Sequence, residues 1–182
     1  LGLLGAKAYI QFRPYGVVGI ISPWNFPLIL SIAPLVEVLA AGNNAMMKLS
    51  EFVPATSELT EELISKYFNE KEVVVINGGP KTSQEFSSLP FDHLLFTGST
   101  AVARKVALSA AENLVPLTLE LGGKSPSIIS QNAKIKKTVD QIMTGKLLNS
   151  GQICISPDYV FAPSDKVSEF VEHAKNHVSE RY

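Results

Sequence analysis

Short runs of apolar, mostly β-branched residues alternate along the chain with longer segments in which apolar residues recur at helical spacing. The short runs predict strands over 17–21, 45–49, 73–76, 93–96 and 116–120. The segments between them predict helices over 28–41, 54–68, 81–87 and 100–113. Because strands and helices that alternate at this spacing are typical of right-handed βαβ units, we expect an α/β fold whose parallel sheet has helices on both faces.

After Gly123 the rhythm of the chain changes. Strands are predicted over 127–129 and 159–162, with helices over 135–149 and from 165 onward. These strands are too few to close a domain. We therefore divide the chain into a domain over 1–122 and the start of a second α/β domain over 123–182, and we expect the chain to be part of something longer.

Composition excludes several classes of function. The 182 residues include 16 basic and 17 acidic side chains, so a net charge of −1 gives no basis for binding nucleic acid or an anionic membrane. The longest apolar stretch, 26–41, is interrupted by prolines and is shorter than the ~20 residues that a membrane span needs. A single cysteine and no recognisable signal peptide fit a reducing compartment, and we expect the cytoplasm. No metal site is predicted.

Unusual residues gather where predicted strands end. Ligands of open parallel sheets bind outside the carboxyl ends of the strands. This rule selects the segments 22–26, 48–51, 78–79, 98–99 and 120–122.

The chemistry of these segments allows more than one interpretation. Ser99 opens a helix, where it can either help to bind phosphate or act as an ordinary N-cap. Lys48 and Glu51 can meet the hydroxyls of a ribose or form a solvated surface pair. Asn25 can stabilise an oxyanion or cap the following helix.

Two further residues have nucleophilic or basic chemistry. Glu120 ends an apolar strand before two glycines, a semi-buried place that suits a general base, although an exposed acid at the end of a strand is the alternative. Cys154, the only cysteine, can act as a nucleophile or can be a small buried hydrophobe.

These segments resemble the successive signatures of the aldehyde dehydrogenase superfamily. The matching motifs, in the order of the family, are Pro23-Trp24-Asn25-Phe26-Pro27, Lys48-Leu49-Ser50-Glu51, Phe96-Thr97-Gly98-Ser99-Thr100, Leu119-Glu120-Leu121-Gly122-Gly123-Lys124-Ser125-Pro126 and Gly151-Gln152-Ile153-Cys154. The compact Gly78-Gly79 connection and the segments 90–96 and 154–160 look most like the class-3 and coniferyl aldehyde dehydrogenase branch.

The resemblance implies a Rossmann-like dinucleotide-binding domain over 1–122 and the N-terminal part of a truncated catalytic domain over 123–182. It implies that Cys154 is the nucleophile, that Asn25 stabilises the oxyanion and that Glu120 activates water. The residues implied to bind the cofactor are Trp24, Lys48, Glu51, Gly78, Gly98, Ser99, Leu121 and Gly122. Among them the three glycines would leave room for the dinucleotide. The implied cofactor is NAD, with NADP also compatible.

The implied reaction oxidises a small-molecule aldehyde, of an aromatic, coniferyl type, to a carboxylic acid, and a homodimer is usual for the branch. Two positions depart from the family pattern, Leu49 in place of proline and Ala103 in place of glycine. A second acidic motif of the family would lie beyond Tyr182.

Three other interpretations remain open. An acylating relative would pass the thioester to coenzyme A or phosphate, although Glu120 argues against it. The chain can also be a nucleotide-binding fragment without turnover, or a redox sensor that uses Cys154.

Overall fold

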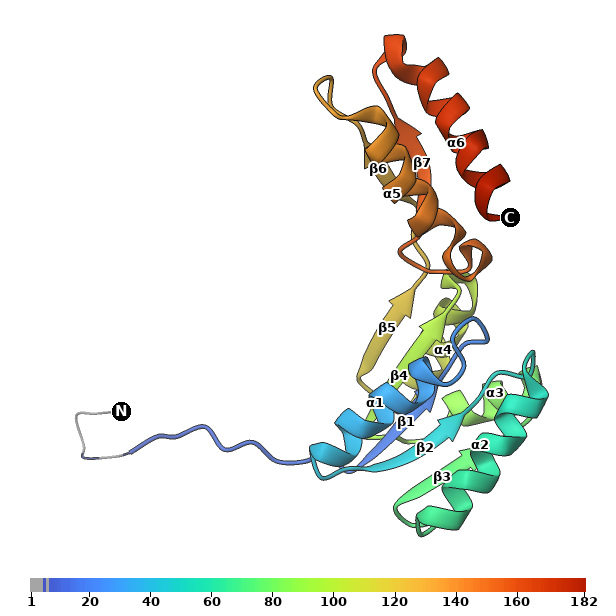
Figure 1. Ribbon diagram of the computed structural model, residues 1–182. Helices are drawn as coiled ribbons and strands as arrows, with labels where there is room; N and C mark the ends of the chain where they lie inside the picture. Colours follow the sequence, from blue (N-terminus) through green and yellow to red (C-terminus); the bar gives the residue numbers. More distant parts are fainter. Residues whose placement is uncertain (1–4, 6) are drawn as a thin grey trace. The chain divides into compact units, whose positions relative to one another are not determined.

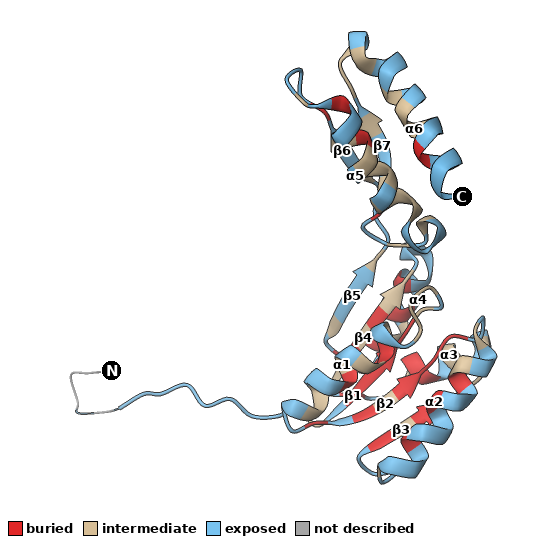
Figure 2. Cartoon of the chain, viewed as in Figure 1, coloured by how far each residue is buried: buried red, intermediate tan, exposed pale blue. Residues whose placement is uncertain are grey.

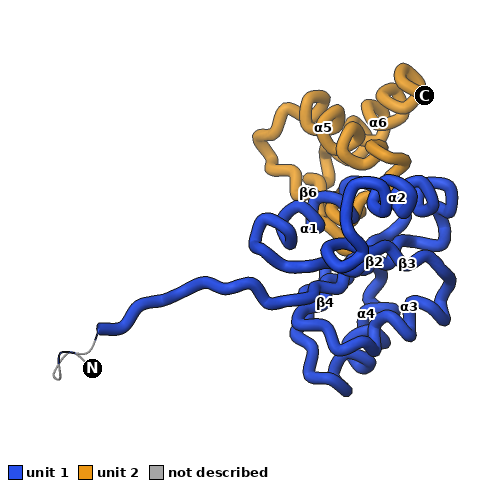
Figure 3. Tube along the Cα trace, turned by 90° about the horizontal axis from the view of Figure 1, so that it is seen from below, with its two compact units in different colours: residues 1–120 blue, residues 121–182 orange. Residues whose placement is uncertain are grey.

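A computed structural model describes residue 5 and residues 7–182 of the chain. The chain divides into two compact units, Leu1–Glu120 and Leu121–Tyr182 (Figure 3).

The first unit contains a five-stranded sheet with the strand order β3-β2-β1-β4-β5 (Figure 1). Strand β1 pairs in parallel with β2 and with β4, and β2 pairs in parallel with β3. All five strands lie where the apolar runs predict them. Their bounds are Val17–Ile21 for β1, Asn44–Lys48 for β2, Val73–Ile76 for β3, His93–Gly98 for β4 and Leu117–Leu121 for β5.

Helices cover both faces of this sheet. Helices α1 and α2 lie on one side of the strands, and α3 and α4 lie on the other (Figure 3). The prediction of an α/β fold with helices on both faces is therefore confirmed. The helices extend over Ile29–Ala40 for α1, Pro54–Tyr67 for α2, Pro80–Ser87 for α3 and Thr100–Ala111 for α4.

The core of the first unit lies on the strands. Ile20, Met47 and Leu94 are at most 1% exposed, and Figure 2 shows that buried residues follow β1, β2, β3 and β4. Leu35 of α1 and Ile64 of α2 complete one side of this core. Each such side chain contributes roughly 1.5–3 kcal/mol on burial, which explains why the near-continuous apolar runs become central strands.

Two polar side chains hold the start of β1 in register with its neighbours. The backbone N–H of Gly16 donates to Asn43 Oδ1 over 3.0 Å, and the N–H of Val17 donates to Asp92 Oδ2 over 2.7 Å. Gly16 has a φ of 134°, and a Cβ there would lie 2.2 Å from the Asp92 carboxylate. Glycine is therefore required where the carboxylate approaches the backbone.

The second unit combines a two-stranded parallel sheet with two helices that pack on each other. Its core consists of Ile129, Ile135 and Val139 with partly buried neighbours. The elements are β6 (Ser125–Ile128), α5 (Ile135–Leu147), the 3₁₀ turn η2 (Leu148–Gly151), β7 (Pro157–Phe161), the 3₁₀ turn η3 (Ser164–Lys166) and α6 (Val167–Arg181).

The helix predicted over 135–149 ends earlier than expected. Its last residue is Leu147, because Asn149 and Ser150 have φ values of 49° and 55°. A left-handed backbone cannot continue a right-handed helix. In the described part of the chain, no helix combines the length and the apolar character that a membrane crossing requires.

A buried histidine connects the two helices of the second unit. His177 on α6 is 4% exposed, and its Nδ1 lies 3.0 Å from Asp140 Oδ1 on α5. The hydrogen bond from His177 holds the pKa of the Asp140 carboxyl below its ordinary value of 3.8, and the positive charges of Lys136 and Arg181 act in the same direction.

We therefore expect Asp140→Asn to destabilise the chain at neutral pH. A carboxyl whose pKa is lowered by folding stabilises the fold above its unfolded pKa, and this contribution is lost as the pH falls through the folded value. The difference in the free energy of unfolding between wild type and variant should thus shrink as the pH is lowered from 7 to about 3. Urea unfolding measures it, with Glu172→Gln on the exposed surface of α6 as control. A difference that is the same at both pH values would contradict this account.

Candidate active site

The order of strands in the first unit reverses between β1 and β4, which are hydrogen-bonded neighbours. Such a switch point is where open parallel sheets bind ligands. Trp24 and Asn25 follow the carboxyl end of β1, while Gly98 and Ser99 lie at the carboxyl end of β4. The fold thus places these four predicted site residues at or just after the carboxyl ends of adjacent strands. Trp24 is 44% exposed and Asn25 is half-buried.

Buried serines stiffen the turn that carries Asn25. The Ser22 N–H donates to the carbonyl of Lys48 over 3.1 Å, which joins the ends of β1 and β2. The Ser31 hydroxyl, 1% exposed, lies 2.8 Å from Ser22 Oγ and also donates to the carbonyl of Pro27. Because both ends of the turn are tied to buried groups, the Asn25 amide is presented on a fixed backbone.

Lys48, the last residue of β2, forms an ion pair with Glu51. Lys48 is only 1% exposed, although the Glu51 side chain remains 32% exposed, and Nζ lies 3.7 Å from Glu51 Oε2. The ammonium also donates to the carbonyl of Leu49. Burial lowers the pKa of Lys48, and the Glu51 carboxylate partly opposes this effect. The pair is therefore not the solvated surface couple that the sequence left open.

Ser99 acts as the N-cap of α4. Its Oγ accepts a long hydrogen bond of 3.4 Å from the N–H of Val102. The ordinary capping role is thus present, and the hydrogen bond is weak enough to be exchanged for a ligand.

The three glycines predicted to leave room for a dinucleotide differ from one another. At Gly78 (φ +152°) a Cβ would lie 2.3 Å from Thr82 Oγ1, and at Gly98 it would lie 2.6 Å from the ring of Phe96. Packing within the chain therefore explains both glycines without a ligand. At Gly122 a Cβ would meet no described atom within 4 Å.

Glu120 is exposed, so the expected semi-buried position is wrong for this chain. It lies near the end of β5, which forms one edge of the sheet. An edge strand has a neighbour on one side only, so its residues stay partly exposed. The alternating apolar pattern of β5 does not reveal that the strand lies at an edge. Leu121, at the end of the strand, is half-buried.

Cys154 lies in the second unit and is exposed, which excludes the small buried hydrophobe as its role. It sits in a turn closed by a 3.0 Å hydrogen bond from the Ser156 N–H to the carbonyl of Ile153. The three residues at 149–151 that lead into this turn all have positive φ. For Asn149 and Ser150 that conformation is strained, and such strain is common beside functional groups.

The sequence patterns do not predict two contacts that lie near Cys154. A Cβ at Gly123 would lie 3.0 Å from the carbonyl oxygen of Cys154. Lys124 Nζ lies 3.1 Å from Asp158 Oδ2. Pro126 signals an irregular strand pairing beside the second contact, because proline interrupts a strand ladder.

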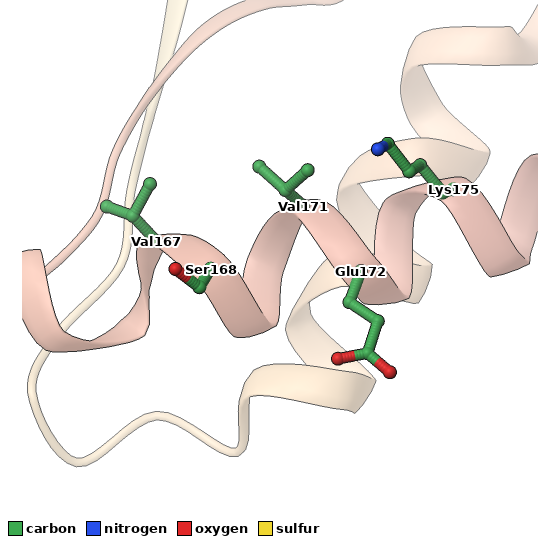
Figure 4. A pocket seen from close by; sticks show the side chains of 5 residues that line it. All are labelled: Val167, Ser168, Val171, Glu172 and Lys175. Carbon is green, nitrogen blue, oxygen red and sulfur yellow. The ribbon is translucent and has the colours of Figure 1, made fainter.

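Two pockets lie away from all the predicted site residues. One, of about 380 Å³, runs along α6, where Val167, Val171 and Lys175 stand in a row and Ser168 and Glu172 complete its lining (Figure 4). The other, of about 270 Å³, lies in the first unit and is lined by ten residues, among them Tyr15 and His93. Within the described residues, no group of three His, Cys, Asp or Glu side chains is arranged to hold a metal ion.

A sequence model of the aldehyde dehydrogenase family matches residues 4–181. The chain belongs to the aldehyde dehydrogenase family. The resemblance inferred from the five motifs is confirmed.

Individual relatives agree with the branch that the sequence suggests. The chain is 59% identical over 179 residues to a probable coniferyl aldehyde dehydrogenase of Caulobacter vibrioides, with 98% of this chain and 37% of the relative covered. It is 40% identical over 176 residues to aldehyde dehydrogenase family 3 member A2 of Rattus norvegicus, with 97% and 36% covered. The chain thus spans little more than a third of these curated relatives.

Solved structures of the family share the fold. A substrate-bound aldehyde dehydrogenase from Staphylococcus aureus matches with a TM-score of 0.90 and 40% identity, covering 93% of this chain and 37% of that one. A Mycobacterium tuberculosis aldehyde dehydrogenase complexed with NAD+ matches with a TM-score of 0.84 and 36% identity, covering 91% and 35%.

Burial of the Lys48 charge predicts a gain in stability when that charge is removed. Folding lowers the pKa of Lys48, so the unfolded chain binds a proton more tightly there than the folded chain does. The free energy of unfolding of the wild type therefore rises with pH between the pKa of Lys48 in the folded state and its ordinary pKa of 10.5. We expect Lys48→Met to raise the free energy of unfolding by about 1 kcal/mol at pH 7, and the gain to shrink toward pH 10.

Urea unfolding at both pH values tests this expectation. Lys105→Met is the matched control, because Lys105 is exposed on α4. A Lys48→Met variant that is less stable than wild type at pH 7 would contradict it.

Proposed function

We propose that this chain supplies the cofactor-binding domain (1–122) and the nucleophile-bearing start of the catalytic domain (123–182) of an NAD(P)-dependent aldehyde dehydrogenase. The enzyme would oxidise an aromatic, coniferyl-type aldehyde to the carboxylic acid. The observation that carries the proposal is the family match over residues 4–181, within which Cys154 lies exposed in a hydrogen-bonded turn. The name of the Caulobacter relative supports the substrate class.

The residues of the first unit fit a dinucleotide. Lys48 offers a buried ammonium and Glu51 a partly exposed carboxylate at the carboxyl end of β2, a pair that can donate to and accept from the two hydroxyls of a ribose. The start of α4 at Ser99 is the place for a phosphate. Trp24 of the first unit and the two residues that begin the second unit, Leu121 and Gly122, complete the proposed cofactor contacts. The NAD+ complex of the Mycobacterium relative supports NAD.

The preference for NAD follows from charge. A Glu51 carboxylate favours a free 2′-hydroxyl and repels a 2′-phosphate, whereas Lys48 beside it is compatible with NADP. Bound NAD(P) would accept the hydride that leaves the substrate carbon.

Cys154 would act first. Its sulfur would bond to the aldehyde carbon to give a thiohemiacetal, whose oxyanion would be held by the Asn25 side-chain amide and the backbone N–H of Cys154. After hydride loss the carbon remains bound to sulfur as a thioester. Glu120 would then accept a proton from water as the water attacks the thioester, which releases the acid and the Cys154 thiolate.

We further propose that the enzyme is a cytoplasmic homodimer. A homodimer is usual for the branch that the chain resembles. The single cysteine is compatible with the cytoplasm. Nucleic acid is not expected as a partner, since the net charge is −1.

Replacing Glu120 separates hydrolysis from acylation. In the full-length protein that contains this chain, we expect Glu120→Gln to form the thioester and NADH once but to release acid at least about 100-fold more slowly, because the base for water is removed. Intact-mass measurement after mixing with NAD and coniferyl aldehyde should show the acyl adduct.

Cys154→Ser is the control and should show no adduct. An adduct in Cys154→Ser would refute the role of Cys154. Acid release by Glu120→Gln at the wild-type rate would refute the role of Glu120 as the base for water. A thioester that wild type passes to added coenzyme A or phosphate and not to water would favour the acylating alternative.

Replacing Glu51 tests the cofactor contact. We expect Glu51→Gln to weaken NAD binding to this chain about 10-fold, because a charge-assisted hydrogen bond to a ribose hydroxyl becomes a neutral one. Titration calorimetry measures the dissociation constant, with Glu58→Gln on the exposed surface of α2 as control. Equal affinity of wild type and Glu51→Gln would exclude this contact. The absence of any NAD binding by the wild-type chain would reduce it to a folded fragment.

A further inference from the structure

A β-bulge lies next to the turn that carries Cys154. Strand β6 pairs with β7 so that Ser125 lies opposite Pro157 and Pro126 lies opposite Tyr159. Asp158 is therefore the extra residue of β7. Pro126 has no N–H to donate to the ladder, which gives the irregularity a cause in the sequence. Bulges re-aim a side chain and are frequent beside active sites.

The bulged residue binds a lysine that directly precedes the other strand, β6. Asp158 Oδ1 and Oδ2 lie 3.2 Å and 3.1 Å from Lys124 Nζ, so the ammonium contacts both carboxylate oxygens. The Lys124 side chain is 78% exposed and the Asp158 side chain is 31% exposed. An exposed pair of this kind contributes little to global stability.

The same two segments also meet at the nucleophile. Gly123 lies directly before Lys124 and passes so close to the carbonyl of Cys154 that a Cβ would be 3.0 Å from its oxygen. The turn from Ile153 to Ser156 is followed at once by Pro157 and Asp158. Asp158 lies on β7, the strand that follows the turn of Cys154. Lys124 lies in the segment that follows Glu120 and Leu121 along the chain. The ion pair between them therefore joins these two segments.

We propose that Lys124 and Asp158 are positioning residues for Cys154: their ion pair, formed at the bulge of β7, sets the distance at which Gly123 passes the Cys154 carbonyl and so fixes the direction of the sulfur. The inference rests on the proposed function and adds to it the device that places the nucleophile.

The two effects of this pair have very different sizes. Its loss leaves stability nearly unchanged because the Lys124 side chain is exposed and the Asp158 side chain is partly exposed. Its loss slows acylation because a reacting group displaced by about 1 Å can lose about 100-fold in rate. A role in stability and a role in positioning are therefore separable by experiment.

Rapid-mixing kinetics of the full-length protein tests the inference. The NADH burst with coniferyl aldehyde is measured for wild type, Lys124→Met, Asp158→Asn and the double charge exchange Lys124→Asp/Asp158→Lys. We expect both single variants to lower the burst rate at least about tenfold, with an unchanged dissociation constant for NAD, and the exchange to restore most of the rate. Unfolding temperatures should stay within about 3 °C of wild type.

Glu85→Gln is the matched control, because it breaks another exposed ion pair, Lys81 with Glu85 on α3, and should leave the burst unchanged. Wild-type burst rates in both single variants would overturn the inference. A lower burst rate in Lys124→Met together with a higher burst rate in Asp158→Asn would also overturn it, because it would indicate an effect of net charge on the reaction. A loss that the exchange does not restore would also overturn it. The proposed function is judged separately, because its failure would appear as a wild-type protein that forms no acyl adduct on Cys154.

Discussion

The parallel sheet of the first unit must be covered on both faces, and this requirement determines where functional groups can lie. Its strands use their side chains for packing, as the buried Ile20, Met47 and Leu94 show. Polar side chains with a functional role are therefore expected at the carboxyl ends of the strands and not within them. The reversal of strand order between β1 and β4 then leaves the segments after these two neighbours as the place for a ligand.

Lys48 is the exception that this arrangement tolerates. It ends β2 with a long side chain that is as buried as the apolar core, although a buried ammonium is unfavourable. The Glu51 carboxylate and the carbonyl of Leu49 compensate the charge only in part, since the pKa of Lys48 remains lowered. A group that reduces stability at neutral pH is more easily understood as a binding residue than as a structural one.

The sequence predicts the elements of this fold well because each strand and helix has a strong apolar pattern. It predicts for the same reason which segments follow the strands, and parallel strands bring these carboxyl ends to one edge of the sheet. It does not predict the exposure of Glu120, because burial at an edge strand depends on neighbours that the pattern of β5 does not contain. It also misses the early end of α5, since Asn149 and Ser150 adopt a left-handed backbone that neither residue requires.

An exposed thiol cannot be positioned by packing, so its backbone has to be positioned instead. In the second unit three backbone features lie on the two sides of Cys154. The left-handed segment at 149–151 leads into the turn, Gly123 passes close to the Cys154 carbonyl, and the bulge at Asp158 follows. The strain of Asn149 and Ser150 persists only if the surrounding contacts oppose its release. A turn held under strain from one side needs a fixed contact on the other side, and Gly123 with the Lys124–Asp158 pair supplies it.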